Sequence, residues 1–251
     1  MKLLRPLIIL IGLLGLWQAV VMITGAPPYI LPQPYDVLDA WISRPLLFLE
    51  HGATTLMEIL MGLAFGLVLG VTSALVMAYF RPAREWLLPV LVISQAVPVF
   101  ALAPILVLWF GYGMASKVVM ATLIIYFPVT AAFHDGLRRT EPGWVELART
   151  MDARRWSILR HVRIPAALPA LGSGLRVATA VAPIGAIVGE WVGSSSGLGY
   201  LMLHANARMQ IDVMFAALAT LALLSIALYF TVDSVIRHSI KWQPDSHPSD
   251  P

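Results

Sequence analysis

Long apolar runs without charged residues are the feature of this sequence that most restricts its fold. Six such runs occur, at residues 6–24, 59–80, 86–110, 118–133, 177–189 and 213–232. A helix needs roughly 20 predominantly apolar residues to cross a bilayer, and the two shortest runs extend toward that length past Lys117 and Arg176. Charged residues make up only 12% of the chain, about half the share found in a soluble domain. The sequence therefore predicts an all-α integral membrane protein with about six transmembrane helices.

The distribution of Lys and Arg predicts how these helices are oriented. If the N-terminus lies in the cytoplasm, thirteen of the 17 Lys and Arg residues fall in cytoplasmic segments, and only Arg44, Lys117 and Arg208 fall outside. Because short cytoplasmic loops are enriched in Lys and Arg, we expect both termini in the cytoplasm. The start of the chain also resembles a cleaved signal peptide. Its apolar run exceeds the about 7–15 residues of a signal core, which favours a retained first span.

Several kinds of chemistry are disfavoured by residues that the chain lacks. It has no cysteine, and its six histidines do not have metal-ligand spacing, so we expect no disulfide and no metal site. A GxxxxGK[ST] loop, a nucleophile elbow and a catalytic acid pair are also missing, which argues against an enzyme. An ion-coupled secondary transporter is an alternative. Such proteins keep paired ionisable groups inside their spans, and only Glu58 and Arg176 are clear candidates here.

Two features inside the predicted spans bear on how the helices assemble. Gly62, Gly66 and Gly70 are spaced four apart in the second run, so they share one helix face. Such small residues allow helices to approach closely, either within one subunit or between two subunits. Arg176 lies in the fifth span, where a charge is costly. Its side chain is expected either to extend toward the cytoplasmic surface or to face the protein interior.

Four residues are candidates for lining a translocation pathway. The prolines of the third run kink its helix, and irregular backbone at membrane depth is tolerated where it is buried or lines a cavity. This favours Gln95 and Pro98 as lining residues, although a kinked helix can also be purely structural. Glu190 and Trp191 end the fifth span before a glycine-serine loop. They are expected either to line an outer gate or to mark the headgroup boundary.

The segment between the fourth and fifth runs is basic and regularly patterned. Pro142 suits the first turn of a helix, and Asp152 is expected to form the turn into a second short helix that ends before Pro165. Four residues share one apolar face of the first helix: Trp144, Leu147, Ala148 and Met151. Such a helix pair can lie on anionic headgroups, can bind nucleic acid, or can dock on a cytoplasmic protein. Its attachment to the bilayer at both ends argues against nucleic acid.

The spacing in this segment resembles that of a known family. Permease subunits of bacterial binding-protein-dependent ABC importers carry a loop motif of EAA, three residues, Gly, nine residues and I-x-L-P. Here Glu146-Leu147-Ala148 is followed at the same spacing by Asp152 in place of glycine, and then by Val162-Arg163-Ile164-Pro165. Asp can adopt the left-handed conformation, at some cost. Residues 94–111 and 189–218 also resemble the subfamily that imports sulfonates, taurine, nitrate or the pyrimidine precursor of thiamine.

The resemblance implies a type I ABC importer permease fold with a cytoplasmic coupling helix. It places an N-terminal transmembrane helix and periplasmic connection over 1–53, the permease core over 54–242 and a disordered cytoplasmic tail over 243–251. The residues implied to contact the ATPase are Trp144, Glu146, Leu147, Ala148, Met151, Asp152 and Pro165. Glu146 would make a charged contact there, or else would serve only as a cap or an intrahelical ion-pair partner.

The same resemblance implies the partners and the location of the chain. It would form a homodimer in the bacterial inner membrane, bind two cytoplasmic ABC ATPase subunits, and receive substrate from a periplasmic binding protein. ATP and Mg would be held by the ATPase, with no cofactor in this chain. The implied function is import of a small polar solute. A thiamine-precursor pyrimidine of the hydroxymethylpyrimidine type is favoured, with aliphatic sulfonates, taurine or nitrate as the alternative.

Overall fold

The computed structural model describes residues 4–242, and every regular element in this range is a helix. The tail predicted to be disordered, 243–251, lies outside the described residues. The helices are α1 (Leu4–Thr24), α2 (Pro34–Ser43), α3 (Pro45–Tyr79), α4 (Arg81–Ser94), α5 (Val99–Phe110), α6 (Met114–Arg138), α7 (Pro142–Thr150), α8 (Arg155–Ile158), the π-helical turn η1 (Leu159–Arg163), α9 (Ile164–Gly193), α10 (Leu198–Ala207) and α11 (Ile211–Ser239).

Four helices are long and apolar enough to cross a membrane. They are α3, α6, α11 and the continuous helix Arg155–Gly193, which joins α8, η1 and α9. The α4–α5 pair is a fifth candidate span, but it is bent by 102°. The apolar stretch Ile8–Thr24 of α1 is a shorter helix. The prediction of an all-α membrane protein is confirmed, with four or five candidate spans and one shorter apolar helix where about six spans were expected.

The third predicted span, 86–110, is broken rather than merely kinked. At the end of α4, the amides of Gln95 and Ala96 bond to carbonyls only three residues back, at 3.2 and 2.9 Å, which tightens and ends the helix. Pro98 then caps α5 at φ −62° and ψ 115°, and it cannot donate a backbone bond. The residue before a proline is also disfavoured in helical conformation. Pro98 therefore explains why the chain turns sharply at this point.

The core of the bundle is built from α3, α6 and α9. A Cβ atom added at Gly62 of α3 would lie 2.5 Å from Cβ of Ala121 in α6, and Gly66 and Gly70 meet Ile125 and Val129 of α6 in the same way. These contacts repeat every four residues on both helices, as expected for close packing along small-residue stripes. The glycine stripe therefore packs within the subunit. This observation decides between the two alternatives that the sequence left open.

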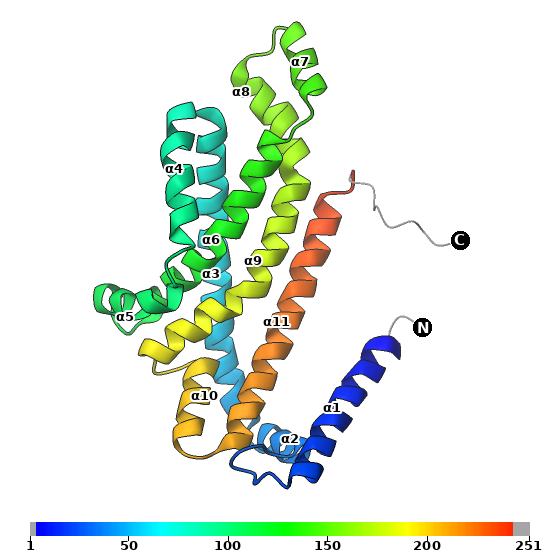
Figure 1. Cartoon of the computed structure of the whole chain (residues 1–251), viewed down its shortest axis with the longest axis vertical. Coiled ribbons are helices and arrows are strands. Elements are labelled where there is room, and N and C mark those ends of the chain that lie inside the picture. The colour runs from blue at the N-terminus through cyan, green and yellow to red at the C-terminus, as the bar shows by residue number, and fades with distance from the viewer. Residues whose placement is uncertain (1–3, 243–251) are drawn as a thin grey trace.

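The two ends of the bundle carry different structures (Figure 1). The hairpin of α7 and α8 projects at one end, beyond the end of α11, whereas α2 and α10 lie at the opposite end. Near that opposite end, the ring of Trp17 in α1 packs at a tilt against Phe215 of α11, with ring centroids 5.5 Å apart, and its indole donates to the carbonyl of Pro32 at 3.1 Å. These contacts attach α1 to the bundle.

A partly buried ion pair between two helices accounts for Arg176. Its Nε donates to Oδ1 of Asp233 in α11 at 2.6 Å, and Oδ2 of Asp233 accepts from Arg237 at 2.8 Å. Arg176 thus faces a neighbouring helix of the same subunit, which was one of the two expected placements. Asp233 was not anticipated as its partner because the two residues are far apart in the sequence. The pair links α9 to α11.

Candidate functional site

Helix α7 has the boundaries that its sequence predicts. Pro142 occupies the first turn, where its missing N–H has no helical partner in any case. At the other end, Asp152 takes the left-handed conformation at φ 56°. The amide of Asp152 bonds to the carbonyl of Arg149 at 2.9 Å, and that of Ala153 bonds to the carbonyl of Ala148 at 3.0 Å. Asp152 therefore forms the turn expected at the motif's glycine position.

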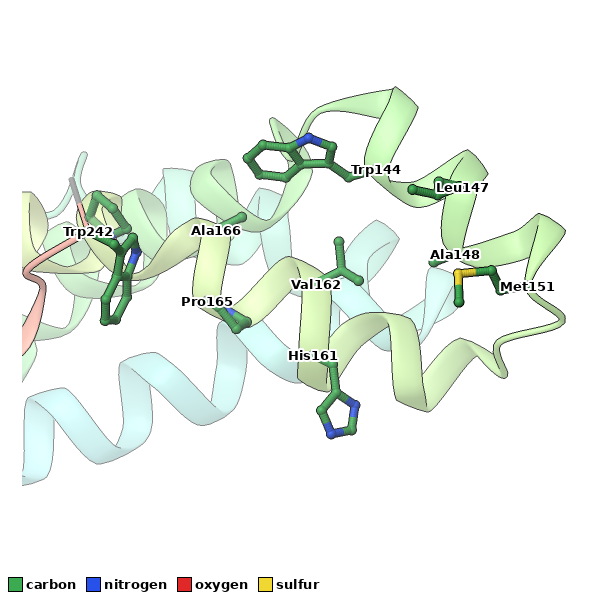
Figure 2. Close-up of a pocket in the computed structure, with 10 residues that line it drawn as sticks. Trp144, Leu147, Ala148, Met151, His161, Val162, Pro165, Ala166 and Trp242 are labelled. Carbon is green, nitrogen blue, oxygen red and sulfur yellow. The ribbon is translucent and has the colours of Figure 1, made fainter. Parts of the chain in front are cut away.

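The apolar face of α7 lines a groove at the tip of the molecule (Figure 2). The groove has a volume of about 620 Å³ and lies between α7 and the start of α9. Its lining residues are Trp144, Leu147, Ala148, Met151, His161, Val162, Pro165, Ala166, Pro169 and Trp242. The three large apolar residues that α7 and its C-cap contribute are strongly exposed: Trp144 at 54%, Leu147 at 62% and Met151 at 76%. The structure thus brings together the apolar residues predicted for α7 and also Pro165.

His161 and Trp242 complete this groove, and sequence reasoning missed both. His161 lies four residues before Pro165, on the helix that faces α7. Trp242 follows α11, and its side chain is 56% exposed. Figure 2 shows Trp242 at one end of the groove and Met151 at the other. An exposed tryptophan just beyond the last span was a signal that could have identified Trp242.

The second half of the hairpin is anchored to the bundle. The indole of Trp156 meets the ring of Tyr79 edge-on at 5.9 Å, and the guanidinium of Arg155 lies 5.8 Å from the centre of the same ring. Ile158 and Leu159 are buried, and Leu159 packs with Phe133 in the core. One side of the hairpin is therefore fixed on the ends of α3 and α6, and α7 is left as the projecting side.

The predicted second short helix is not a separate element. Residues 155–193 form one continuous helix, in which the π-helical turn η1 connects α8 to α9. Pro165 directly follows the π turn, in which the amide of Ile164 bonds to the carbonyl of Leu159 five residues back, and this looser bonding accommodates the missing N–H of the proline. The prediction that the second short helix ends before Pro165 is therefore wrong. The hairpin instead continues directly into a core helix.

Glu146 lies exposed on α7. None of the salt bridges found within residues 4–242 involves it, and it is not the N-cap of α7, which is Glu141. Neither the cap nor the intrahelical ion pair that would give Glu146 a merely local role is present. Its carboxylate remains available to a partner.

The candidate pathway residues are not gathered at one place. Gln95 and Pro98 lie exposed at the break between α4 and α5, and Trp191 at the end of α9 is 44% exposed. Glu190, next to Trp191, is only 1% exposed. In this structure the side chain of Glu190 is enclosed by α3 and α10 rather than open to a cavity.

Glu190 belongs to a buried polar cluster that was not anticipated. Its Oε1 accepts from the hydroxyl of Thr55 in α3 at 2.6 Å, and its Oε2 accepts from the amides of Gly199 and Tyr200 in α10. The amide of Leu198 donates to Thr55 at 2.8 Å. These bonds tie the start of α10 to α3 and α9.

Two more ionisable side chains complete the cluster. The carboxyl group of Glu58 lies beside that of Glu190 and near Lys117. The Lys117 ammonium donates to the carbonyls of Tyr112 and Gly113 at 2.9 and 3.1 Å. Glu58 is 1% exposed and Lys117 is 4% exposed. A sequence signal did exist, because Thr55 and Glu58 are three residues apart and so share one face of α3.

Comparisons with known proteins agree with this architecture. A family model described as "Binding-protein-dependent transport system inner membrane component" matches residues 66–242. A "Probable ABC transporter permease protein" of Haemophilus influenzae is 55% identical over 96% of this chain and 98% of its own length. The "Formylaminopyrimidine transport permease protein ThiX" of Halalkalibacterium halodurans is 36% identical over 96% of each chain. The "Riboflavin transport system permease protein RibX" of Chloroflexus aurantiacus is 38% identical over 92% of this chain and 87% of its own.

The fold is also found in a solved structure. A chain of the MetNI methionine ABC transporter, in an inward-facing conformation, superimposes with a TM-score of 0.68 over 78% of this chain and 97% of that chain. The two sequences are 21% identical, so the similarity concerns the fold alone. It is the fold of a type I ABC importer permease.

Proposed function

Because the chain belongs to the family of binding-protein-dependent transport system inner membrane components, we propose that it is the membrane subunit through which an ATPase drives solute import. In this proposal two copies of the chain form a homodimer in the bacterial inner membrane. Two cytoplasmic ATPase subunits hold ATP and Mg, and a periplasmic binding protein delivers the solute. Both termini lie in the cytoplasm, as the distribution of Lys and Arg favours.

The exposed apolar face of α7 is the observation that carries this proposal. Trp144, Leu147 and Met151 are each more than half exposed, and they lie on a hairpin that projects beyond the bundle (Figure 1). Apolar side chains presented in this way, with the exposed carboxylate of Glu146 beside them, suit a protein partner. Docking energy concentrates in a few such anchors, often aromatic ones. We therefore assign α7 as the coupling helix that docks on the ATPase.

The fixed side of the hairpin explains how docking would act on the membrane part. Helix 155–193 runs without interruption from the hairpin into the core, and α9 packs closely against α6. A displacement of α7 by the ATPase therefore moves α9 through Asp152 and the turn that follows it. The hairpin can transmit movement to the membrane part only if the ATPase binds it firmly. A lipid surface would not hold it in this way.

Combining Trp144→Ala with Glu146→Ala tests the docking role. The double variant should insert and fold normally, because both side chains are exposed. Its ATPase binding should weaken by about tenfold or more, since 1.4 kcal/mol of lost contact corresponds to a factor of ten. Copurification of the ATPase with the purified membrane subunit measures this loss, and uptake into cells should fall with it.

The matched control is Tyr35→Ala, because Tyr35 is 72% exposed on α2 at the opposite end of the bundle. This variant should copurify with the ATPase like the unchanged chain. Full ATPase binding and full uptake in the double variant of α7 would contradict the docking role.

The solute in this proposal is a thiamine-precursor pyrimidine of the hydroxymethylpyrimidine type. Two observations support it. Residues 197–218 resemble permeases for this kind of solute, and one of the similar relatives is named as a formylaminopyrimidine permease. The riboflavin permease is about equally similar, and its solute is likewise a planar nitrogen heterocycle. The shared property of these solutes is a flat, polar aromatic ring.

A further inference from the structure

A buried cluster of three ionisable side chains lies where α3, α6, α9 and α10 meet. It consists of Glu58, Lys117 and Glu190, whose exposed fractions are 1%, 4% and 1%. Ionised groups are costly to bury in a membrane protein unless they are paired and hydrogen-bonded. The charge that this cluster holds is therefore constrained by the bonds available to each group.

Glu190 has the bonds that an ionised carboxylate requires. One oxygen accepts from the Thr55 hydroxyl, and the other accepts from the amides of Gly199 and Tyr200. These amides belong to the first turn of α10, a ten-residue helix whose N-terminal end favours a negative charge. The backbone conformation of Gly197, at φ 107°, brings them close to the carboxylate. The negative charge of the cluster therefore belongs on Glu190.

Glu58 lacks such bonds. Its Oε2 is buried and has no hydrogen-bond partner among the described residues. The nearest cation, Lys117, already directs its ammonium to the carbonyls of Tyr112 and Gly113. His51, also at this end of α3, accepts a hydrogen bond at Nδ1 from the amide of Gly197. No hydrogen bond joins it to Glu58 among the described residues. A second negative charge on Glu58, beside Glu190, would be unpaired.

We propose that Glu58 is protonated and donates a hydrogen bond to the ionised Glu190, so that the two carboxyl groups together hold one negative charge, which Lys117 balances. The cluster is then neutral as a whole, and the protonated carboxyl group of Glu58 becomes a hydrogen-bond donor. The site is a proton-binding site inside the bundle, in which Glu58 holds the proton and Glu190 accepts the hydrogen bond. Because Glu190 also caps α10, the shared proton positions the start of α10 against α3.

Infrared spectroscopy of the full-length chain in lipid nanodiscs tests this assignment directly. At neutral pH, the spectrum of the unchanged chain should contain the C=O stretch of a protonated carboxylic acid, and Glu58→Gln should remove it. The matched control is Glu50→Gln, which changes an exposed glutamate of the same helix and should leave the band in place. Absence of the band from the unchanged chain, or its persistence in Glu58→Gln, overturns the proposal.

Amide hydrogen exchange supplies a readout that depends on which carboxyl group is ionised. Glutamine has the shape of a protonated glutamate, so Glu58→Gln should fold and keep slow exchange at Leu198, Gly199 and Tyr200. Glu190→Gln removes the charge that these amides bind, and their exchange should quicken by about tenfold or more. The reverse pattern, or a Glu58→Gln chain that does not fold, overturns the proposal, because the proton would then reside on Glu190.

Discussion

At the scale of single residues, Gly197 shows how narrowly the loop before α10 is defined. It has φ 107°, a conformation that side chains rarely adopt, and an added Cβ would overlap the carboxylate of Glu190. Only glycine both adopts this backbone conformation readily and leaves room for the carboxylate of Glu190. The first glycine of the SSSGLGY stretch, Gly197, is thus explained by the buried carboxylate of Glu190 next to it.

Replacing Gly197 with alanine should therefore destabilise the chain by roughly 2–4 kcal/mol, from about 1–3 kcal/mol of backbone strain and the displacement of Glu190. Thermal unfolding of the purified protein measures the effect as a lowered Tm. Gly12→Ala is the control, because no atom lies within 4 Å of a Cβ added there. Equal Tm values for the two variants would show that Glu190 is not held in the way described.

At the scale of helices, the continuity of 155–193 is the feature on which coupling depends. If α7 is pushed by a partner, the push reaches α9 only while η1 remains helical. Arg160 is an exposed residue of η1, so it can be replaced without disturbing the core. Glycine at this point lowers helix stability by about 1 kcal/mol relative to alanine.

Arg160→Gly should therefore retain ATPase binding and ATP hydrolysis but reduce uptake relative to Arg160→Ala. The difference arises because a softened helix absorbs motion that a stiff one transmits. The ratio of solute transported to ATP hydrolysed, measured in proteoliposomes, reports this loss of coupling. Identical ratios for the two variants would place the transmission elsewhere.

At the scale of the whole molecule, the energy source for transport is expected to be ATP, and the solute is expected to be a hydroxymethylpyrimidine. Proteoliposomes that contain the chain, its ATPase and its binding protein should accumulate hydroxymethylpyrimidine when ATP is enclosed with the ATPase. Accumulation should survive collapse of the proton gradient, because the energy comes from ATP. Taurine and riboflavin are the comparison solutes. Uptake that stops when the gradient collapses would instead favour an ion-coupled transporter.

The family and the architecture could be predicted because they rest on local patterns. The apolar runs, the small-residue stripe and the spacing from Glu146 to Pro165 are each contained within a few helical turns. The same holds for the left-handed turn at Asp152, whose position followed from the motif. The family is confirmed by the match over residues 66–242, and the fold by the solved methionine transporter chain.

The remaining features depend on contacts between distant segments. The bond from Thr55 to Glu190 joins residues 135 positions apart, and Arg176 and Asp233 lie on different helices. A single sequence does not reveal such pairs, so the buried partners of Glu190 were not anticipated. The break at Pro98 and the continuity of the helix through Pro165 were also missed. Whether a helix continues past a proline depends on the surrounding backbone hydrogen bonds, which a single sequence does not show.

The continuous helix 155–193 has a consequence for how the two ends of the molecule influence each other. Its 39 residues amount to about 58 Å of helix measured along the axis, at 1.5 Å per residue, with the hairpin near one end and Glu190 near the other. Two binding events that are coupled through one helix obey thermodynamic reciprocity. If a nucleotide-driven movement of the hairpin changes the free energy of protonating the distant carboxyl cluster, then protonation of that cluster must change the free energy of the hairpin movement by the same amount.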